Sequence, residues 1–141
     1  MLNVPKIEVG SNVTLQRVVE EEDTALNYGS GKLDKLFATP SLVALMIEAA
    51  VTLVDDKLDE ELITVGKIAQ VVHEKATILG QTVSVEVKIK EFDGNNITFE
   101  MVAYDEIGVI GRGEHQRIIV NQESLLDKAN QRAARLNNMD F

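Results

Sequence analysis

The chain has 141 residues, a formal net charge of −9 and no cysteine. A chain of this length can bury a core without disulfides, so a single domain over residues 1–141 is expected. The lack of cysteine excludes a cysteine nucleophile, a thiolate zinc site and a dithiol redox motif. The acidic balance disfavours a nucleic-acid or anionic-membrane surface, because phosphate binding depends on clustered lysine and arginine.

The sequence predicts no membrane segment and no metal site. Residues 1–6 lack the apolar core of a signal peptide. The longest apolar run, Leu42–Ile47, is far shorter than the roughly 20 residues that span a bilayer. The histidines, His73 and His115, have no partner at metal-ligand spacing. We therefore expect a cytoplasmic protein with no metal and no membrane or nucleic-acid partner.

The first third of the chain predicts a strand, a loop and the start of a helix. Residues 12–19 alternate between apolar and polar side chains, as in a half-buried strand. An acidic, glycine-containing stretch over 20–31 predicts a loop or a lid. Residues 41–58 predict an apolar helix, with Thr39 as its N-cap and Pro40 in its first turn.

At about 100° per residue this helix has a broad apolar face opposite a polar stripe. The predicted apolar face contains Leu42, Val43, Met46, Ile47, Ala50, Leu53 and Val54. The polar stripe contains Ser41, Glu48, Thr52 and Asp55. Because buried carboxylates are uncommon unless they are paired, Glu48 is expected at the solvent or in a subunit interface.

After the helix the hydrophobic period changes from 3.6 to 2, which predicts strands. One strand covers 63–73, and the next contains Val83, Val85, Val87 and Ile89 in alternation with polar residues. Its partner, 97–104, follows the hairpin signal Asp93-Gly94.

A turn at 105–108 then leads into a strand that ends near Val120. Asn121 is suited to cap a closing helix over 122–136. This order of elements predicts an α+β fold, in which one curved antiparallel sheet wraps around the central helix.

The spacing of several short segments is similar to that of a known family. Phe37-Ala38-Thr39, Leu45-Met46, Gly66, His73 and Gly80 lie in one ungapped register, which resumes at Ile110–Arg117. This pattern resembles the hotdog-fold thioesterases, and among them the group typified by fluoroacetyl-CoA thioesterase. The resemblance implies a hotdog fold, a homodimer with sites between subunits, and hydrolysis of an acyl-CoA or related thioester. Coenzyme A would then be part of the substrate, and no separate cofactor is expected.

The resemblance also implies roles for particular residues. Thr39 at the helix start and His73 on the following strand match the family's catalytic positions, and Gly66 matches a glycine of the substrate pocket. Phe37 and Arg117 lie in the matching segments and are further candidates for substrate binding. The family's helix glutamate falls on Ile47 in this chain, with Glu48 one residue later and about 100° around the helix. Glu48 is therefore a catalytic candidate only if the helix register is shifted.

Each of these residues also has a purely structural interpretation. Thr39 can be a helix cap, His73 a core histidine on the face of Ala69 and Val71, and His115 a structural neighbour of Arg117. The remaining basic candidates for coenzyme A phosphates are scattered along the chain: Lys67, Lys75 and Arg112. The substitution at Ile47 leaves a second hypothesis open, a non-catalytic acyl-CoA-binding hotdog protein. A hotdog hydratase or dehydratase is a third and weaker alternative.

Overall fold

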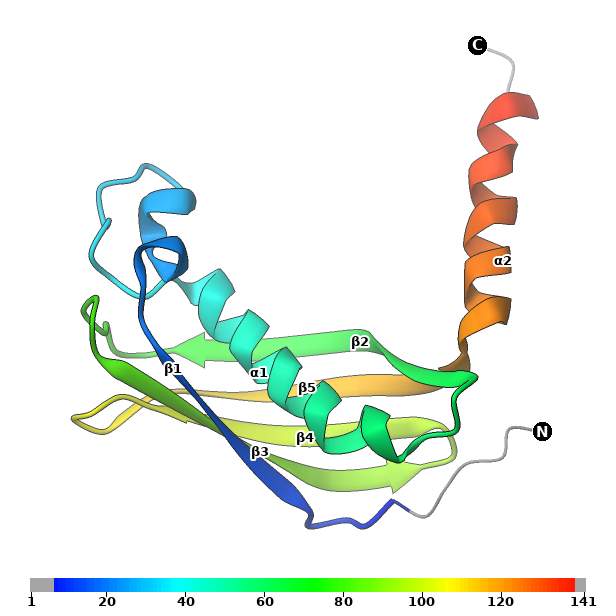
Figure 1. Ribbon diagram of the computed structural model, residues 1–141, viewed down its shortest axis with the longest axis horizontal. Helices are drawn as coiled ribbons and strands as arrows, with labels where there is room; N and C mark the ends of the chain where they lie inside the picture. The colour runs from blue at the N-terminus through cyan, green and yellow to red at the C-terminus, as the bar shows by residue number, and fades with distance from the viewer. Residues whose placement is uncertain (1–6, 139–141) are drawn as a thin grey trace.

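The computed structural model describes residues 7–138. Its sheet is antiparallel throughout, with the strand order β1-β3-β4-β5-β2, and helix α1 lies across one face of it (Figure 1). The strands are β1 (Asn12–Val18), β2 (Leu62–His73), β3 (Thr82–Asp93), β4 (Asn96–Tyr104) and β5 (Val109–Asn121), and the long helices are α1 (Thr39–Val54) and α2 (Gln122–Ala134). The predicted arrangement of a curved sheet around a central helix, with a C-terminal helix, is confirmed.

The core lies between α1 and the sheet. The predicted alternation in β3 is confirmed, because Val83, Val85, Val87 and Ile89 all lie inside, while Glu86 and Lys88 between them are exposed. The hairpin at Asp93-Gly94 joins β3 to β4, and Gly94 adopts a positive φ of 62° there. Glycine adopts this left-handed conformation without steric cost.

Strands β1 and β2 form the two edges of the sheet. β2 pairs with β5 along its whole length, apart from a register shift between Gly66 and Ile68. Its other edge has no strand partner within residues 7–138. An open edge of this length is a site for pairing with another strand.

Helix α1 differs from the prediction at both ends. It begins at Thr39 rather than at residue 41, and it ends at Val54, followed by a 3₁₀ turn at Asp55–Lys57. The N-cap is Ala38, and Thr39 is already helical. The prediction that Thr39 caps the helix was therefore wrong. Its hydroxyl instead contacts a side chain of β2, which is described below.

The buried face of α1 is also rotated from the predicted one. Leu45 and Ala49 are buried, whereas Val43 and Ile47 are only half-buried. The helix packs mainly over β3 and β1, and this turns the face centred on Leu45 and Ala49 toward the sheet. Glu48 is exposed, in agreement with the predicted polar stripe.

Helix α2 stands away from the sheet at one end of the molecule (Figure 1). Its N-cap is Asn121, as predicted, with the side-chain oxygen accepting a hydrogen bond of 3.0 Å from the Ser124 amide. The α-helix ends at Ala134, two residues earlier than predicted, and a 3₁₀ turn follows over Arg135–Asn138. No residue of α2 is buried. Within residues 7–138 no helix is both long and apolar enough to cross a bilayer.

Candidate active site

The structure brings Thr39 and His73 together. The Thr39 hydroxyl oxygen lies 2.7 Å from Nδ1 of His73, a hydrogen bond between the first residue of α1 and the last residue of β2. These residues are 34 positions apart in the sequence, and they are the two that the family resemblance marked as catalytic. Their contact matches that expectation, whereas a catalytic role stays a prediction.

Backbone hydrogen bonds hold the start of α1 beside the end of β2. The Phe37 amide donates to the Thr77 carbonyl at 2.8 Å, and the Ala38 amide donates to the Asp23 carbonyl at 2.9 Å. On the other side of His73, Gly111 of β5 allows close packing. A Cβ at this glycine would lie 2.7 Å from the Val72 carbonyl oxygen, a distance that real Cβ atoms do not show.

Phe37 lies against the imidazole. The Phe37 ring is buried, and its centroid is 6.4 Å from that of His73 with the rings at 72°, an edge-to-face contact. The two side chains border a cavity of about 460 Å³. Its apolar wall includes Tyr28, Leu33, Leu36 and Phe37, and its polar groups come from Thr39, His73, Glu74 and Lys75. A cavity of this size and lining accommodates a small acyl group.

The environment of His73 favours a neutral imidazole. Burial lowers the pKa of His73, and a weaker interaction with the Lys75 backbone raises it. A histidine with a depressed pKa is an available base near neutral pH. Its Nε2 atom is buried and has no hydrogen-bond partner among residues 7–138. The Nδ1 atom contacts the hydroxyl of Thr39, which also borders the cavity.

Neither Glu48 nor Ile47 borders this cavity. Glu48 instead lines a separate cavity of about 230 Å³ with Arg17, Asp23 and Ser41. The ion pair there, between Arg17 and Asp23 at 3.0 Å, does not involve Glu48. Within one subunit the helix register is not shifted toward His73, and the described cavity around Thr39 has no glutamate from α1.

Arg117 belongs to a buried polar cluster on β5 and β2. Its guanidinium donates to the Thr64 hydroxyl at 2.8 Å through Nε and to the Thr64 carbonyl at 2.9 Å through Nη2. The Thr64 hydroxyl in turn donates to Asp55 at 2.6 Å. Burial lowers the pKa of Arg117, and the Asp55 carboxylate opposes this effect. The cluster therefore holds one cation in a fixed orientation.

His115 completes this cluster. Arg117 Nη1 lies 3.2 Å from Nε2 of His115, and His115 Nδ1 lies 2.7 Å from the Ile68 carbonyl. Because a guanidinium only donates, Nε2 is the acceptor and Nδ1 carries the proton. Burial lowers the pKa of His115, and the neighbouring charge of Arg117 lowers it further, whereas the hydrogen bond to Ile68 raises it. These contacts fit the structural interpretation of this residue.

Sequence reasoning did not identify Thr64 and Asp55 as partners of Arg117. The period-2 pattern of β2 predicts that Thr64 points inward, and Asp55 is the last residue of the predicted polar stripe. The sequence therefore contained a signal for each of these residues separately. The missing information was that the turn after α1 brings Asp55 back to β2.

Gly66 lies beside Arg117 and not beside His73. A Cβ at Gly66 would be 3.5 Å from Nη1 of Arg117, which is ordinary contact. Gly66 and His73 are seven positions apart on β2, a distance of roughly 23 Å along an extended strand. In the described chain the predicted site residues therefore form two clusters, one around Gly66 and Arg117 in the first half of β2 and one around Thr39 and His73 at its end. No group of metal-binding side chains is found within residues 7–138.

Both clusters face the same side of the sheet. Gly66 lies opposite Arg117, Ala69 opposite His115, and His73 opposite Gly111 in the register of β2 and β5. Directly opposed residues in a sheet point to the same face. The two clusters consequently lie on the face that α1 covers.

Comparisons with known proteins agree with this geometry. The family model described as "Fluoroacetyl-CoA-specific thioesterase" matches residues 19–123. A fluoroacetyl-CoA thioesterase from Streptantibioticus cattleyicolor is 30% identical over 98 residues, which cover 70% of each chain.

Solved structures show the same fold. The fluoroacetyl-CoA thioesterase FlK superposes with a TM-score of 0.83 at 26% identity, over 90% of this chain and 98% of that chain. A hot-dog-like protein from Thermanaerovibrio acidaminovorans has a TM-score of 0.83 at 27% identity, over 88% and 91% of the two chains. The protein has the hotdog fold, and it belongs to the fluoroacetyl-CoA-specific thioesterase family.

Proposed function

We propose that this protein hydrolyses small acyl-CoA thioesters in a site formed by two subunits. The observation that carries the proposal is the 2.7 Å contact between Thr39 and His73 at the edge of an apolar cavity. The relatives support the substrate class, since one variant of FlK has been solved in complex with acetyl-CoA and another with fluoroacetate and coenzyme A. Coenzyme A enters as part of the substrate, and the reaction has no need of a separate cofactor.

In the proposed reaction, water attacks the thioester carbonyl carbon. Its proton passes through the Thr39 hydroxyl to Nδ1 of His73, because Nδ1 contacts that hydroxyl and Nε2 is buried. The amides at the start of α1 favour the negative charge that develops on the carbonyl oxygen. When the carbon–sulfur bond breaks, the imidazolium returns the proton to the thiolate. The products are a carboxylic acid and free coenzyme A.

In this proposal the second subunit pairs with the free edge of β2. Two copies of this edge can pair antiparallel about a two-fold axis. If the axis passes at Gln70, Ala69 of one strand lies opposite Val71 of the other, and the extra residue of the bulge between Gly66 and Ile68 brings Gly66 opposite His73. The exposed stretch Gly66–Gln70 is in the middle of this edge, which supports the placement.

Such a dimer would join the two clusters that one chain keeps apart. Gly66 of the partner subunit would then border the cavity of Thr39 and His73, with Arg117 of the partner subunit behind it. The missing side chain at Gly66 leaves room for an acyl group, and the anchored guanidinium supplies a positive charge near the carbonyl or the acyl substituent. Lys75 at the cavity is placed to meet coenzyme A phosphates. A cytoplasmic location would suit this substrate.

A panel of acyl-CoA substrates of increasing chain length, with a free-thiol readout, tests the hydrolase proposal. Thr39→Ala should reduce turnover and Thr39→Ser should retain most of it, because only serine keeps the relaying hydroxyl. A burst of thiol followed by slower turnover would instead show an acyl-threonine intermediate. Light scattering should give at least twice the chain mass of 15.6 kDa, and a stable monomer would remove the shared site.

Ile47 favours a second candidate function, acyl-CoA binding without hydrolysis. The family's carboxylate position carries this half-buried apolar side chain, and the buried Nε2 of His73 has no acceptor among the described residues. A wild-type protein that binds acyl-CoA but releases no thiol would favour this alternative. If Ile47→Glu then released thiol, the lack of a carboxylate at this position would be the reason that the wild type does not hydrolyse acyl-CoA.

A further inference from the structure

Helix α2 has an apolar surface that its own chain does not cover. Leu126 is 54% exposed and Leu136 is 63% exposed, and no residue of the helix is buried. Figure 1 shows α2 rising from the sheet on the side where α1 lies, with no other element beside it. A free helix of this length is marginal in water without packing against something.

The 20–36 loop, between β1 and α1, has a second uncovered apolar surface. Leu26 and Tyr28 are each 44% exposed, and Leu33 is 58% exposed. Tyr28 and Leu33 also line the cavity of Thr39 and His73. Whatever packs on this loop therefore covers the mouth of the candidate active site.

The two surfaces have opposite charge. The outer half of α2 has Lys128 and Arg132, the 3₁₀ turn after it has Arg135, and residues 128–138 contain no acidic side chain. The loop begins with Glu20-Glu21-Glu22. Hydrogen bonding and charge from Glu22 raise the pKa of Glu20, which shows that these carboxylates are crowded. A basic surface placed against them would relieve this repulsion.

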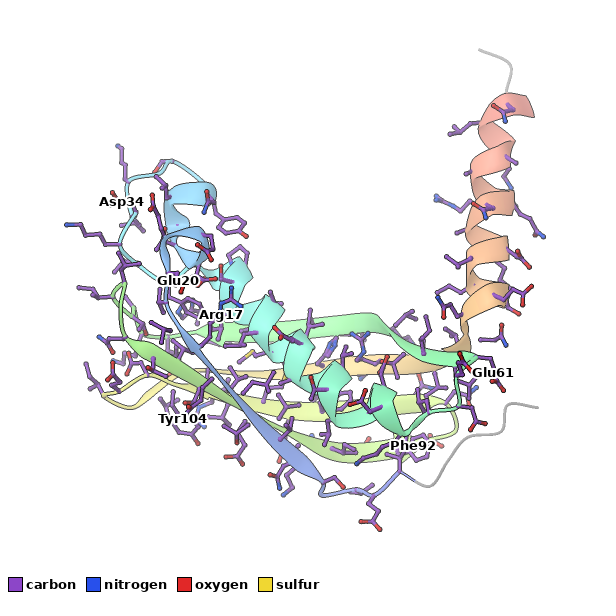
Figure 2. All side chains as sticks on the ribbon, viewed as in Figure 1. Arg17, Glu20, Asp34, Glu61, Phe92 and Tyr104 are labelled. Carbon is purple, nitrogen blue, oxygen red and sulfur yellow. The ribbon has the colours of Figure 1, made fainter. Side chains whose placement is uncertain are left out.

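Within one chain α2 and the loop lie at opposite ends of the molecule. Figure 2 labels Glu61 at the foot of α2, and Glu20 and Asp34 in the loop at the far end. The Gln122 amide donates to the Glu61 carbonyl at 2.9 Å, which fixes the start of α2 beside the start of β2. The loop is held beyond the end of β2, where Leu36 bridges to Ile78. The helix therefore cannot cover the loop of its own chain.

An antiparallel pair of β2 strands brings these ends together across the dimer. The start of β2 in one subunit then lies beside the end of β2 in the other, so α2 stands next to the partner's loop. A cavity of about 500 Å³ in the angle between Glu61 and α2, lined also by Leu126, offers space for a segment from outside the chain. Both α2 and the loop project to the same side of the sheet (Figure 1).

From these observations we infer that α2 of each subunit packs on the 20–36 loop of the partner subunit and covers the partner's active-site cavity. Leu126 and Leu136 would contact the exposed apolar side chains of the loop, and the basic outer half of α2 would face Glu20-Glu21-Glu22. The inference rests on the proposed two-subunit site. It adds that the second subunit also closes the mouth of the cavity and restricts the size of the acyl group.

Site-directed cross-linking tests this arrangement without requiring activity. The chain has no cysteine, so the two introduced cysteines are the only thiols in each subunit. The double variant Leu126→Cys/Leu33→Cys, treated with a short bismaleimide, should give a covalent dimer on a denaturing gel. The matched control is Leu126→Cys/Ile107→Cys, because Ile107 is 87% exposed and lies in the β4–β5 turn, outside the loop. Only the first pair should cross-link.

The outcomes separate this inference from the proposed hydrolysis. A native dimer in which both pairs fail to cross-link, or in which the control reacts equally well, would overturn the placement of α2. A monomer by light scattering would overturn it too, whether or not thiol is released. Cross-linking in a protein without hydrolase activity would support the placement and contradict only the hydrolase proposal.

A charge swap gives a second, kinetic test in an active protein. Arg132→Glu places a negative charge against the acidic stretch and should raise KM for acyl-CoA about tenfold, or about 1.4 kcal/mol, with kcat little changed. Glu21→Lys in the same chain should restore KM, because the pair is again opposite in sign. If Arg132→Glu leaves KM unchanged, or Glu21→Lys does not restore it, α2 does not face the partner's loop.

Discussion

The two ends of β2 differ in how completely their polar groups are satisfied. At one end, Arg117 and His115 are buried and bonded to Thr64 and to the Ile68 carbonyl. At the other end, His73 has one hydrogen bond, to Thr39, and a buried Nε2 without a partner within residues 7–138. The Arg117 cluster thus resembles a structural core, whereas the His73 cluster resembles an active site. Satisfied networks rigidify, whereas Nδ1 of His73 contacts a hydroxyl that borders the cavity and can take up a proton there.

This difference suggests separate roles for the two clusters in the proposed dimer. Each subunit would present a rigid cation at the start of β2 and a reactive base at its end, and the two-fold axis would bring unlike ends together. Mutations at the two ends should therefore affect different measured quantities. Activity should depend most on the His73 end, and folding stability most on the Arg117 end.

The largest expected effect is on turnover in His73→Ala. A general base contributes roughly 10²- to 10⁴-fold to the rate, so thiol release should fall by this factor while binding of the coenzyme A product changes only a few-fold. Turnover and product affinity would be measured in the same preparation. The thermal midpoint serves as the control for folding, and a loss of less than threefold with the fold intact would exclude His73 as the base.

Arg117→Ala should have its main effect on stability. The substitution removes charged hydrogen bonds to Thr64 and leaves buried acceptors unpaired, which costs about 2–3 kcal/mol of unfolding free energy. Urea denaturation measures this loss, and Thr64→Val is the matched control because it removes the same hydroxyl contact from the other side. An Arg117→Ala protein as stable as wild type would show that the cluster is not a structural anchor.

The sequence predicted the fold well because its signals were local. The alternation in β3, the Asp93-Gly94 turn and the Asn121 cap each depend on a few adjacent residues. Errors arose where tertiary packing decides. The rotation of α1 toward β1 and β3 buries Leu45 and Ala49 in place of Val43 and Ile47. A helical wheel shows which residues share a face, but it does not show which face packs against the sheet.

The candidate site was predictable only in part, for a related reason. The family spacing grouped Thr39 with His73, and the structure places the two side chains in contact, with the hydroxyl bonded to the imidazole in place of a capping role. The same spacing grouped Gly66 and Arg117 with His73, although about seven residues of strand, roughly 23 Å, separate them in one chain. In the proposed dimer these residues would meet across the subunit boundary, and sequence spacing alone contains no information on which subunit supplies a residue.

Gly66→Ala tests whether Gly66 borders the proposed shared cavity without disturbing the fold. A Cβ at this position meets Arg117 and His115 at ordinary contact distances of 3.5 and 3.6 Å, so the thermal midpoint should change little. If Gly66 borders the partner's cavity, the methyl group should raise KM about tenfold, or 1.4 kcal/mol, for the larger acyl groups. An unchanged KM across the substrate panel would place Gly66 outside the site.

Gly113→Ala provides the contrasting control for this test. A Cβ there would lie 2.6 Å from the Gln70 carbonyl oxygen, which is backbone and cannot move aside easily. This variant should lose stability, with a lowered thermal midpoint. The pair distinguishes a glycine that leaves room for substrate from a glycine that allows two strands to approach.

The dependence of stability on pH compares the two histidines. Burial lowers the pKa of both His73 and His115 below the unfolded value of about 6.5. The unfolded chain therefore binds protons first as the pH falls, and the free energy of unfolding should decrease between about pH 7.5 and pH 5.5. Urea denaturation across this range measures the slope. His115→Gln should flatten it, and a wild-type slope of zero would contradict the depressed pKa values.

The smallest effect is expected for Glu48→Gln. Glu48 is exposed on the polar stripe of α1, and it lines a cavity that contains neither Thr39 nor His73. Removing its charge eliminates no interaction with the reacting atoms in the described subunit, so turnover should change less than about threefold. Steady-state kinetics on the best substrate of the panel measures this ratio, with Glu86→Gln as the control for a general charge effect, because Glu86 is an exposed residue of β3. A loss of a hundredfold or more in Glu48→Gln alone would mean that the dimer brings this carboxylate to a site in a way that one chain does not. Glu48 would then supply the acid whose family position is occupied by Ile47.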